Sequence, residues 1–574
     1  MQPNDVERPL HSAATNILFG SDIVAETLRA LEIPWIALTP GASYRGLHDS
    51  LVNHLGNERP QMLVCLHEES AVALAHGWAK VTGRPMAAAV HSNVGLFHAT
   101  MAIFNAWCDR APLLAIGATG PVDATKRRPW IDWIHTAQDQ GAIVRPYVKW
   151  DAQPSSSAAA REALLRAYWL AATAPCAPVY VNLDAGLQEA AMTESLPPLD
   201  PSRFMPQPIA GAPPQAVGKA ADLLRQAKHP LILMGRVSRS EHAWAQRVAL
   251  AEALGARVGT DGKAGAAFPT DHALHIGAPA TFPSEALKAA LQAADVILSL
   301  DWVDLGGTLT ASCGVMPMGK IVHVSLDHHL HNGWSMDHQA LPTVDLLLPA
   351  EPDAVVAALL EELEIAAEPY RIERILPSAM VTRGGPISIG HLAKALRAIT
   401  AGQAVSLLHV PLGWNFADWP LRHPLDYIGS EGGAGIGAGP GVAVGAALAL
   451  RGSGRLPVAV LGDGDYLMGV TALWTAVHYH IPLLVIVANN RSFFNDEVHQ
   501  ERVARMRGRP VENRWIGQRL AEPEIDLAQL GRAQGTAGYG PVSDMAELPA
   551  ILREAVATVT AGGVAVVDVR TSDV

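Results

Sequence analysis

Short apolar runs alternate with amphipathic windows along most of the chain. In the last third, "LPVAVL" (456–461) and "LLVIVA" (483–488) are rich in Val, Ile and Leu, and "LMGVTALWTAVHYH" (467–480) between them has the spacing of an amphipathic helix. Buried strands joined by a helical crossover are typical of a parallel sheet. The pattern therefore predicts a right-handed β–α–β unit over 456–488.

The middle of the chain shows the same alternation. The apolar runs in "HPLILMG", "ADVILSLD" and "KIVHVSL" predict buried strands, and the Ala-rich window "SEALKAALQAA" predicts a helix. Strands that alternate with helices indicate an α/β domain with a parallel sheet.

The two ends of the chain resemble each other. Residues 87–118 and 458–488 have the same order of strand, turn, helix, Pro and strand, and one constant offset aligns Pro112 with Pro482 and Phe104 with Trp474. A duplicated domain explains this order. The alternative is that any two β–α–β units look alike.

Two Pro-rich stretches interrupt the alternation, at 197–214 and 368–386. Proline cannot continue a helix or a central strand, so both stretches are predicted to be linkers. A chain of 574 residues is too long for one core. We therefore predict three doubly wound, parallel-sheet α/β domains over 1–190, 215–365 and 385–574.

Composition excludes several classes of protein. The chain is 49% hydrophobic and 17% charged, with a formal net charge of -12 and no run of basic residues, so neither nucleic acid nor an anionic membrane is an expected partner. Four scattered cysteines suit a reducing compartment. The N-terminal residues lack the pattern of a signal peptide, and no long apolar stretch is present. A soluble, cytoplasmic protein is expected.

Polar residues follow both strands of the predicted unit at 456–488. Asp463 lies in "GDG" after the first strand, and Asn490 ends the "NN" after the second. The carboxyl ends of parallel strands lie at the same edge, where ligands of doubly wound sheets bind. Gly462 and Gly464 allow a diphosphate to approach the backbone, and carboxylate and amide oxygens suit Mg²⁺. The sequence therefore predicts a metal-bridged diphosphate.

This pair of motifs resembles the signature of thiamine-diphosphate enzymes, in which GDG is followed by NN about 25 residues later. The resemblance implies that thiamine diphosphate and Mg²⁺ are the cofactors. It also implies that Asp463, Asn490 and the main-chain oxygen of Ser492 bind the metal. On this resemblance, the three predicted domains are, in order, the pyrimidine-binding, middle and diphosphate-binding domains.

The same resemblance implies a glutamate that hydrogen-bonds the aminopyrimidine ring of the cofactor. "HEESAVALAHGWAK" offers Glu68 and Glu69, and Glu68 is preferred because it precedes Gly77 by nine residues. The family also places a bulky apolar residue under the cofactor. "GGAGIGAGPGVAVG" is similar to that stretch and puts Ile436 there, although Gly441 replaces the usual proline.

Within the family, "HSNVGLFHATMAIFNAW" resembles the stretch of benzoylformate decarboxylase that supplies a proton-transferring histidine. His91 lies 23 residues after Glu68, which is the expected spacing. One departure concerns the serine that contacts the substrate carboxylate, because "TPGASYRG" has Ala42 at that position and Ser43 beside it. FAD is not expected, since the FAD-binding segment of acetohydroxyacid synthases is not found in the middle domain.

Further substrate contacts are predicted on two other segments. "IHTAQDQ" places His135 where oxalyl-CoA decarboxylase has a tyrosine, and Phe493 and Phe494 begin a segment that is either a lid or a surface helix. Arginines in that segment can bind phosphate groups, so an acyl-CoA substrate is a further alternative.

The resemblance implies non-oxidative decarboxylation of a 2-oxo acid to an aldehyde. The alternatives are a carboligase or lyase, such as a 2-hydroxyacyl-CoA lyase or an acetolactate synthase-like enzyme, and a catalytically silent assembly protein. Because related enzymes assemble the site between subunits, a homodimer or homotetramer is expected.

Overall fold

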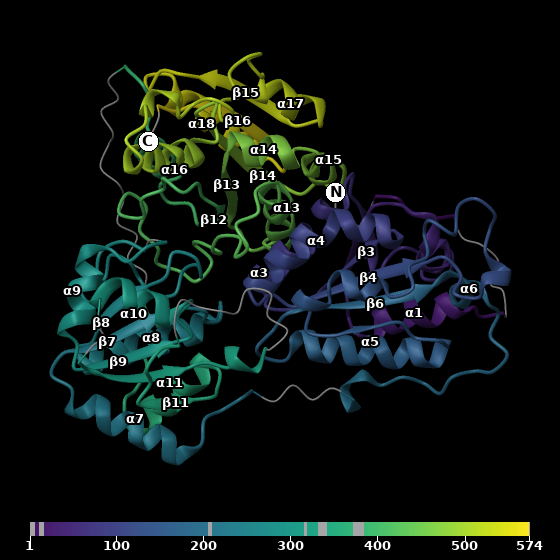
Figure 1. Ribbon diagram of the computed structural model, residues 1–574, viewed down its shortest axis with the longest axis horizontal. Coiled ribbons are helices and arrows are strands. Elements are labelled where there is room, and N and C mark those ends of the chain that lie inside the picture. The colour runs from purple at the N-terminus through teal and green to yellow at the C-terminus, as the bar shows by residue number, and fades with distance from the viewer. Residues whose placement is uncertain are drawn as a thin grey trace.

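The computed structural model describes residues 6–10, 17–204, 209–279, 281–314, 318–330, 341–370 and 384–572. Parts of both predicted linkers, 205–208 and 371–383, lie outside this range. Figure 1 shows three α/β units, the N-terminal one in purple and blue, the middle one in teal and the C-terminal one in green to yellow. In the described part of the chain, no helix has both the length and the apolar character needed to span a membrane.

The N-terminal unit contains six strands in the order β2-β1-β3-β4-β6-β5, and all their pairings are parallel. The strands are β1 (Trp35–Leu38), β2 (Gln61–Val64), β3 (Met86–Val90), β4 (Leu113–Thr119), β5 (Asp151–Ala152) and β6 (Pro178–Asp184). The α-helices are α1 (Gly20–Ala30), α2 (Arg45–Asp49), α3 (Glu68–Thr82), α4 (Ser92–Cys108), α5 (Ser157–Ala172) and α6 (Ala185–Glu189).

The middle unit has a parallel sheet in the order β11-β10-β9-β7-β8. Its strands are β7 (Pro230–Met234), β8 (Arg257–Thr260), β9 (Val296–Leu300), β10 (Lys320–Val324) and β11 (Leu346–Leu348). Its helices are α7 (Pro214–Gln226), α8 (Glu241–Leu254), α9 (Glu285–Ala293), α10 (Leu305–Cys313) and α11 (Pro352–Glu362). The predicted strands and helix are confirmed as β7, β9, β10 and α9, whereas β8 and β11 are too short to produce a clear apolar pattern.

The C-terminal unit has a parallel sheet in the order β12-β13-β14-β16-β15. Its strands are β12 (Val405–His409), β13 (Leu456–Gly462), β14 (Leu483–Asn489), β15 (Ala537–Val542) and β16 (Val564–Arg570). Its helices are α12 (Ile389–Ile399), α13 (Gly439–Ala449), α14 (Asp463–Gly469), α15 (Ala472–His478), α16 (Phe494–Met506), α17 (Leu527–Ala533) and α18 (Leu548–Thr560).

The β–α–β unit predicted over 456–488 is confirmed, with one correction. Its helical segment begins at Asp463 rather than at residue 467, and it is divided into α14 and α15 at Val470 and Thr471. The "GDG" sequence therefore forms the start of a helix instead of a separate turn. Gly462 precedes that helix in an extended conformation, as its N-cap residue.

The terminal units have equivalent sheets. Strands β1-β3-β4-β6-β5 follow one another in the N-terminal sheet in the same order as β12-β13-β14-β16-β15 in the C-terminal sheet. The segments that matched in sequence, β3 to β4 and β13 to β14, occupy the same places in these orders. The shared order supports the predicted duplication.

Strand residues face two different cores, as a doubly wound sheet requires. In β13, Val458 and Val460 belong to one buried apolar cluster, and Ala459 and Leu461 belong to another. Because successive strand residues point to opposite faces, both faces of the sheet are covered. This is why the strands are continuous apolar runs in the sequence.

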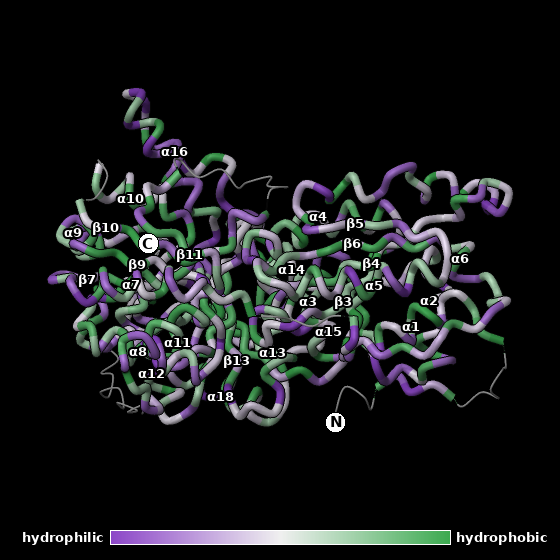
Figure 2. Tube along the Cα trace, turned by 90° about the horizontal axis from the view of Figure 1, so that it is seen from below, coloured by the Kyte–Doolittle hydropathy of each residue, from purple (hydrophilic) through white to green (hydrophobic). Residues whose placement is uncertain are grey.

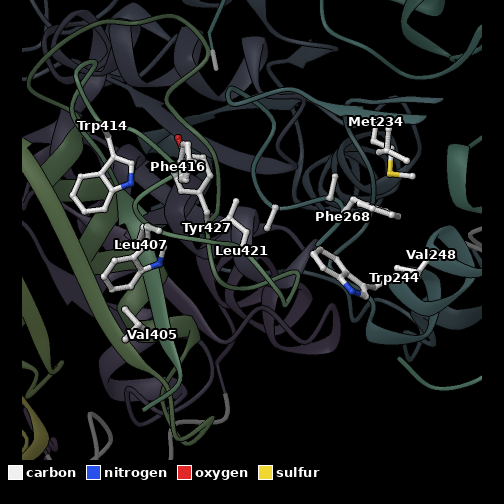
Figure 3. Packing of buried hydrophobic residues seen from close by; sticks show 14 of the residues in the cluster. Met234, Trp244, Val248, Phe268, Val405, Leu407, Trp414, Phe416, Leu421 and Tyr427 are labelled. Carbon is white, nitrogen blue, oxygen red and sulfur yellow. The ribbon is translucent and has the colours of Figure 1, made fainter. Parts of the chain in front are cut away.

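One apolar cluster is shared by the middle and C-terminal units. Figure 3 shows Trp244 and Phe268 of the middle unit next to Leu421, Tyr427 and other apolar side chains of the C-terminal unit. All of these side chains are buried. The two units therefore pack through a common hydrophobic core.

The N-terminal and C-terminal units meet where α3 and α13 cross, near the centre of Figure 1. Glycines allow the two helix backbones to approach each other closely. A Cβ atom at Gly77 would collide with the Val442 carbonyl oxygen, and one at Gly445 would collide with the Leu74 carbonyl oxygen. Any side chain at these positions would force the helices apart.

We predict that Gly445→Val destabilises the protein by at least about 1–3 kcal/mol, because its side chain has no space between α3 and α13. Urea unfolding monitored by circular dichroism measures the change. Gly218→Ala in α7 is the matched control, since the nearest atom to a Cβ there is 3.9 Å away. Equal stability of Gly445→Val and the wild type would contradict the tight helix crossing.

Candidate functional site

Polar side chains gather at the carboxyl ends of the strands in both terminal units. The N-terminal half-site comprises Ser43 after β1, Glu68 after β2, His91 after β3, His98 on α4 and His135 after β4. The C-terminal half-site comprises Asp463 and Gly464 after β13, and Asn490, Ser492 and Phe493 after β14. Both groups lie where ligands of doubly wound sheets bind.

Asp463 is the buried centre of the C-terminal half-site. Its Oδ1 accepts the Gly464 N–H at 2.8 Å, and its Oδ2 accepts the Ser492 N–H at 3.2 Å. The Asn490 side-chain oxygen also accepts the Ser492 N–H, at 3.0 Å. Burial raises the pKa of Asp463, although these backbone hydrogen bonds oppose the shift. The carboxylate oxygens of Asp463 and the side-chain oxygen of Asn490 therefore lie close together around the Ser492 N–H.

The two glycines of "GDG" have different surroundings. A Cβ at Gly462 would meet no atom within 4 Å, whereas one at Gly464 would lie 2.6 Å from the Phe493 ring. Open space beside Gly462 fits the predicted approach of a diphosphate. Gly464 instead makes room for Phe493, so this residue has a packing role that its place in the motif did not suggest.

A buried carboxylate connects the C-terminal half-site to α16. The Ser492 hydroxyl donates to Glu497 at 2.6 Å, and the same carboxylate lies 3.2 Å from the Arg519 Nε and 3.4 Å from the Arg514 Nε. The guanidinium of Arg514 also lies 5.7 Å from the centre of the Phe494 ring. Figure 2 shows α16 projecting from the body of the molecule. The predicted helix at this segment is confirmed, but its function as a lid is still a prediction.

In the N-terminal half-site, Ser43 and His91 are hydrogen-bonded. The Ser43 Oγ lies 2.9 Å from the His91 Nδ1, and the Ser43 N–H donates to the same nitrogen at 3.4 Å. A backbone N–H can only donate, so Nδ1 is an acceptor and neutral His91 carries its proton on Nε2. Ser43 is buried whereas Ala42 is exposed, so Ser43 is the residue that faces the half-site.

His135 completes this group from the loop after β4. Its ring packs edge-on against the His91 ring, with centroids 4.7 Å apart, and its carbonyl oxygen accepts the Ser92 hydroxyl at 3.2 Å. Burial lowers the pKa of His91, the nearby charges of His135 and Arg128 lower it further, and Glu68 opposes them. These effects together favour the neutral form of His91.

Glu68 is buried at the start of α3 and contacts two histidines that the sequence analysis did not select. His98 Nδ1 lies 3.1 Å from the Glu68 Oε2, and the rings of His67 and His98 stack with centroids 4.9 Å apart. In the sequence, nothing distinguishes these two histidines from the others. Only the folded structure shows that they lie next to Glu68. The spacing of 30 residues between Glu68 and His98 has no periodicity that reveals it.

Glu69 faces the C-terminal unit instead. Burial raises the pKa of Glu69, and the negative charge of Asp465 raises it further. Asp465 lies in α14, where its Oδ1 accepts the Gly437 N–H at 2.6 Å and the Gly439 N–H at 3.2 Å. Adjacent acids of α3 thus face different surroundings. Glu68 is the one that lies with His91 and Ser43.

The Gly-rich stretch before α13 is held by a buried charge cluster of His409, Glu431 and Asp465. The His409 Nε2 lies 3.1 Å from Glu431 and 3.6 Å from Asp465. Burial lowers the pKa of His409, but the two carboxylates outweigh this effect and raise the pKa to about 9. Because Asp465 binds the backbone on both sides of Ala438, the cluster fixes the stretch that presents half-exposed Ile436.

The two half-sites have separate sets of hydrogen bonds among the described residues. Among the described residues, no hydrogen bond or ion pair connects Glu68 with Asp463, Asn490 or Ser492. The structure groups Ser43, Glu68, His91 and His135 on the N-terminal unit, and it groups Asp463, Asn490 and Ser492 on the C-terminal unit.

Comparison with known proteins identifies the family to which these half-sites belong. Models of the N-terminal TPP binding domain, the central domain and the C-terminal TPP binding domain of thiamine pyrophosphate enzymes match residues 19–143, 217–341 and 412–569. The chain belongs to the thiamine pyrophosphate enzyme family. Thiamine pyrophosphate and thiamine diphosphate are the same molecule, so the family and its cofactor agree with the resemblance found in the sequence. The predicted domain boundaries are still a prediction.

Similar proteins include enzymes with two kinds of activity. The chain is 26% identical to a Pseudomonas aeruginosa benzoylformate decarboxylase, over 75% of this chain and 78% of the relative. It is 27% identical to a probable 2-ketoarginine decarboxylase of the same species, over 89% and 86%. It is 26% identical to the large subunit of an Escherichia coli acetolactate synthase, over 83% of each chain.

Solved structures confirm the fold of this thiamine pyrophosphate enzyme. A 4-hydroxybenzoylformate decarboxylase from Rhodococcus jostii superposes with a TM-score of 0.77 at 21% identity, over 97% of this chain and 99% of that one. A benzoylformate decarboxylase from Polynucleobacter necessarius gives 0.76 at 22% identity, over 96% and 98%. All three predicted parallel-sheet α/β domains are thus present.

The C-terminal half-site has the chemistry that the cofactor requires. Asp463 and Asn490 provide a carboxylate and an amide oxygen, which are hard donors of the type that Mg²⁺ prefers. The Ser492 main chain lies against both side chains. The open space beside Gly462 leaves the adjacent backbone accessible to a phosphate group. The residues present therefore fit a metal-bridged diphosphate.

We predict that Asp463→Asn weakens binding of thiamine diphosphate in the presence of Mg²⁺ by at least about 100-fold, because the metal loses its charged ligand. Calorimetric titration of the cofactor-free protein measures the affinity. Asp496→Asn is the matched control, since Asp496 is exposed on α16. An unchanged affinity in Asp463→Asn would remove Asp463 from the metal site.

We also predict that the His409 cluster makes stability depend on pH. The folded pKa of about 9 exceeds the usual value of about 6.5, so its contribution is fully present below pH 6.5 and is lost as pH rises through about 9. His409→Gln removes the cation that lies between two buried carboxylates and lowers stability by about 3–5 kcal/mol near neutral pH. Urea unfolding of both proteins from pH 6 to 10 measures the difference. A difference that does not shrink at high pH would contradict the ion pair.

Proposed function

We propose that this chain is a thiamine-diphosphate and Mg²⁺ dependent decarboxylase that converts a 2-oxo acid to an aldehyde. The observation that carries the proposal is the group formed by Ser43, His91 and His135 next to Glu68. It combines a hydroxyl that can bind a carboxylate with a histidine that can transfer a proton. The similarity to two decarboxylases supports this activity.

The bound cofactor supplies an electron sink for cleavage of a carbon–carbon bond next to a carbonyl. On this proposal, Asp463, Asn490 and the Ser492 carbonyl would hold Mg²⁺ next to the diphosphate. Ile436 would support the cofactor from the Gly-rich stretch, and Glu68 would hydrogen-bond its pyrimidine ring. These residues bind and orient the cofactor, while the N-terminal half-site also acts on the substrate.

The substrate-facing roles follow from the hydrogen bonds of the N-terminal half-site. The Ser43 hydroxyl donates its one proton to His91 Nδ1 in this structure, and on this proposal it turns to donate that proton to the carboxylate when substrate binds. Conversion of a 2-oxo acid anion to an aldehyde and CO₂ consumes one proton. On this proposal the neutral His91 ring takes up a second proton from solvent and delivers one from Nε2 to the carbon that loses CO₂, which returns the ring to its neutral form. His135 packs against His91 and limits the positions of its ring. Phe493 and Phe494 exclude water at the start of α16.

A carboligase or lyase is the second candidate. The acetolactate synthase relative is 26% identical over 83% of each chain, close to the value for benzoylformate decarboxylase. The arginine-rich sequence of 502–519 also offers positive charge to an acyl-CoA or another anionic second substrate. In such an enzyme, an aldehyde or acyl group replaces the proton that His91 delivers.

We further propose a homodimer or homotetramer in the cytoplasm, with each active site made from the N-terminal half-site of one chain and the C-terminal half-site of another. The absence of a hydrogen bond or ion pair between Glu68 and Asp463 among the described residues supports this arrangement. Apolar residues next to the half-sites are also exposed, as Phe97 is at 55% and Met468 at 60%. A second chain would cover them.

We predict that the wild type releases CO₂ and an aldehyde from at least one member of a panel of aromatic, aliphatic and guanidino 2-oxo acids. His91→Ala should still release CO₂ but release aldehyde at least about 10²-fold more slowly, because protonation of the product carbon loses its donor. Stopped-flow detection of CO₂ and coupled detection of aldehyde measure both steps. His229→Ala in the middle unit is the control.

Rapid aldehyde release by His91→Ala would remove His91 from proton transfer. If the wild type releases no CO₂ from the panel but joins or cleaves carbon–carbon bonds with aldehydes or acyl-CoAs, the carboligase or lyase is the correct function.

We predict that mixing two inactive variants restores activity. Glu68→Gln and Asp463→Ala damage different half-sites, so a dimer with one chain of each has one intact site between its subunits. Random exchange then restores up to about one quarter of the wild-type rate. Activity is measured after the variants are unfolded and refolded together, with each variant refolded alone as the control. No recovery in a confirmed mixed dimer would place the whole site within one chain.

A further inference from the structure

Glu68 is held by a side chain that lies outside the predicted site. The His98 Nδ1 lies 3.1 Å from the Glu68 Oε2, although the two residues are on different helices. His98 lies seven residues after His91, two turns farther along the same side of the helical segment that starts there. The helix that begins next to His91 therefore also supplies a partner for Glu68.

The contact fixes the orientation of the carboxyl group. While Oε2 faces His98, Oε1 lies over the backbone of α4, where a Cβ at Gly95 would be only 3.0 Å from it. Only 8% of Glu68 is exposed, so its carboxyl group has little freedom to rotate. Because Oε2 is hydrogen-bonded and the carboxyl group cannot rotate freely, Oε1 can accept a hydrogen bond from a ligand in only one direction.

The second histidine of this cluster is fixed in a neutral form. The Glu69 N–H donates to the His67 Nδ1 at 3.2 Å, so this nitrogen is an acceptor. Burial lowers the pKa of His67 and a positive charge on His98 lowers it further, whereas Glu68 opposes these effects. The His67 ring stacks on the His98 ring at an interplanar angle of 18°. The neutral His67 ring therefore packs against the His98 ring and limits its movement.

We propose that His98 is a positioning residue for Glu68. Its Nδ1–H donates to Oε2 and holds the carboxyl group in one orientation, in which the carboxyl group would meet the pyrimidine ring of the cofactor. This inference rests on the proposed function, because it requires Glu68 to be the acid that activates the cofactor.

The proposal predicts that a neutral hydrogen-bond donor at position 98 can replace His98. The other titratable groups near the pair are His67 at the start of α3, His91 at the start of α4 and Tyr44 after β1. All three are retained when only His98 is changed, so a difference between variant and wild type isolates His98.

The experiment uses two variants of the full-length holoenzyme. His98→Asn retains an N–H donor close to the position of Nδ1 but does not titrate, and His98→Leu removes the donor. The exchange rate of the hydrogen at C2 of the bound cofactor is measured by acid quench and NMR from pH 5 to 8. Cofactor affinity is measured separately by calorimetry on the cofactor-free protein. His229→Asn in the middle unit is the control for a histidine substitution.

His98→Leu should slow the exchange by at least about 10-fold, with a change of less than about 3-fold in cofactor affinity. His98→Asn should restore most of the rate. Wild-type exchange in His98→Leu would overturn the proposal. So would a folded His98→Asn that is as slow as His98→Leu, because packing rather than hydrogen bonding would then explain the effect.

Glu68→Gln separates this inference from the proposed function. It should slow the exchange by at least about 10²-fold, and the double variant Glu68→Gln, His98→Leu should be no slower, because His98 acts through Glu68. If Glu68→Gln exchanges at the wild-type rate, the proposed role of Glu68 fails. If Glu68→Gln is slow but the His98 variants behave as the wild type, only the role of His98 fails. A further loss in the double variant would show that His98 acts independently of Glu68, which also overturns the proposal.

Discussion

The crossing of α3 and α13 is the contact on which the arrangement of both half-sites depends. Gly77 and Gly445 let the two backbones touch, so the N-terminal and C-terminal units are locked at one distance and angle. Glu68 begins α3, and the Gly-rich stretch that carries Ile436 leads into α13. A side chain in this crossing would therefore displace elements of both half-sites, although it lies away from the polar residues themselves.

The two units then present their polar residues for the same geometric reason. Parallel strands leave their carboxyl ends at one edge, and the loops after them carry Ser43, His91 and His135 in one unit and Asp463 and Asn490 in the other. Each half-site has only part of the required chemistry. On the proposed function, the N-terminal one supplies proton transfer and carboxylate binding, and the C-terminal one supplies oxygen ligands. Assembly of the two between subunits is part of that proposal.

Charged and polar contacts outside each half-site orient its residues. His409 lies between the two buried acids next to the Gly-rich stretch, Glu497 links Ser492 to the arginines at the base of α16, and exposed His98 contacts buried Glu68. These contacts differ in their chemistry, but each one orients a residue that is proposed to bind the cofactor or its metal. A polar group in a buried position keeps one orientation only when its partners are satisfied.

The sequence by itself determined the family, the α/β class and the main candidates, because these depend on local order. Apolar runs predicted β7, β9, β10, β13 and β14, and the spacing of Asp463 and Asn490 predicted a shared edge. Only the tertiary structure decided which acid of the pair at 68–69 faces the histidines, that Ser43 rather than Ala42 bonds His91, and that Gly464 packs against Phe493. It also revealed His98 and His409. Their partners are distant in sequence and lie on other elements, and no local pattern of apolar and polar residues records a contact of that kind.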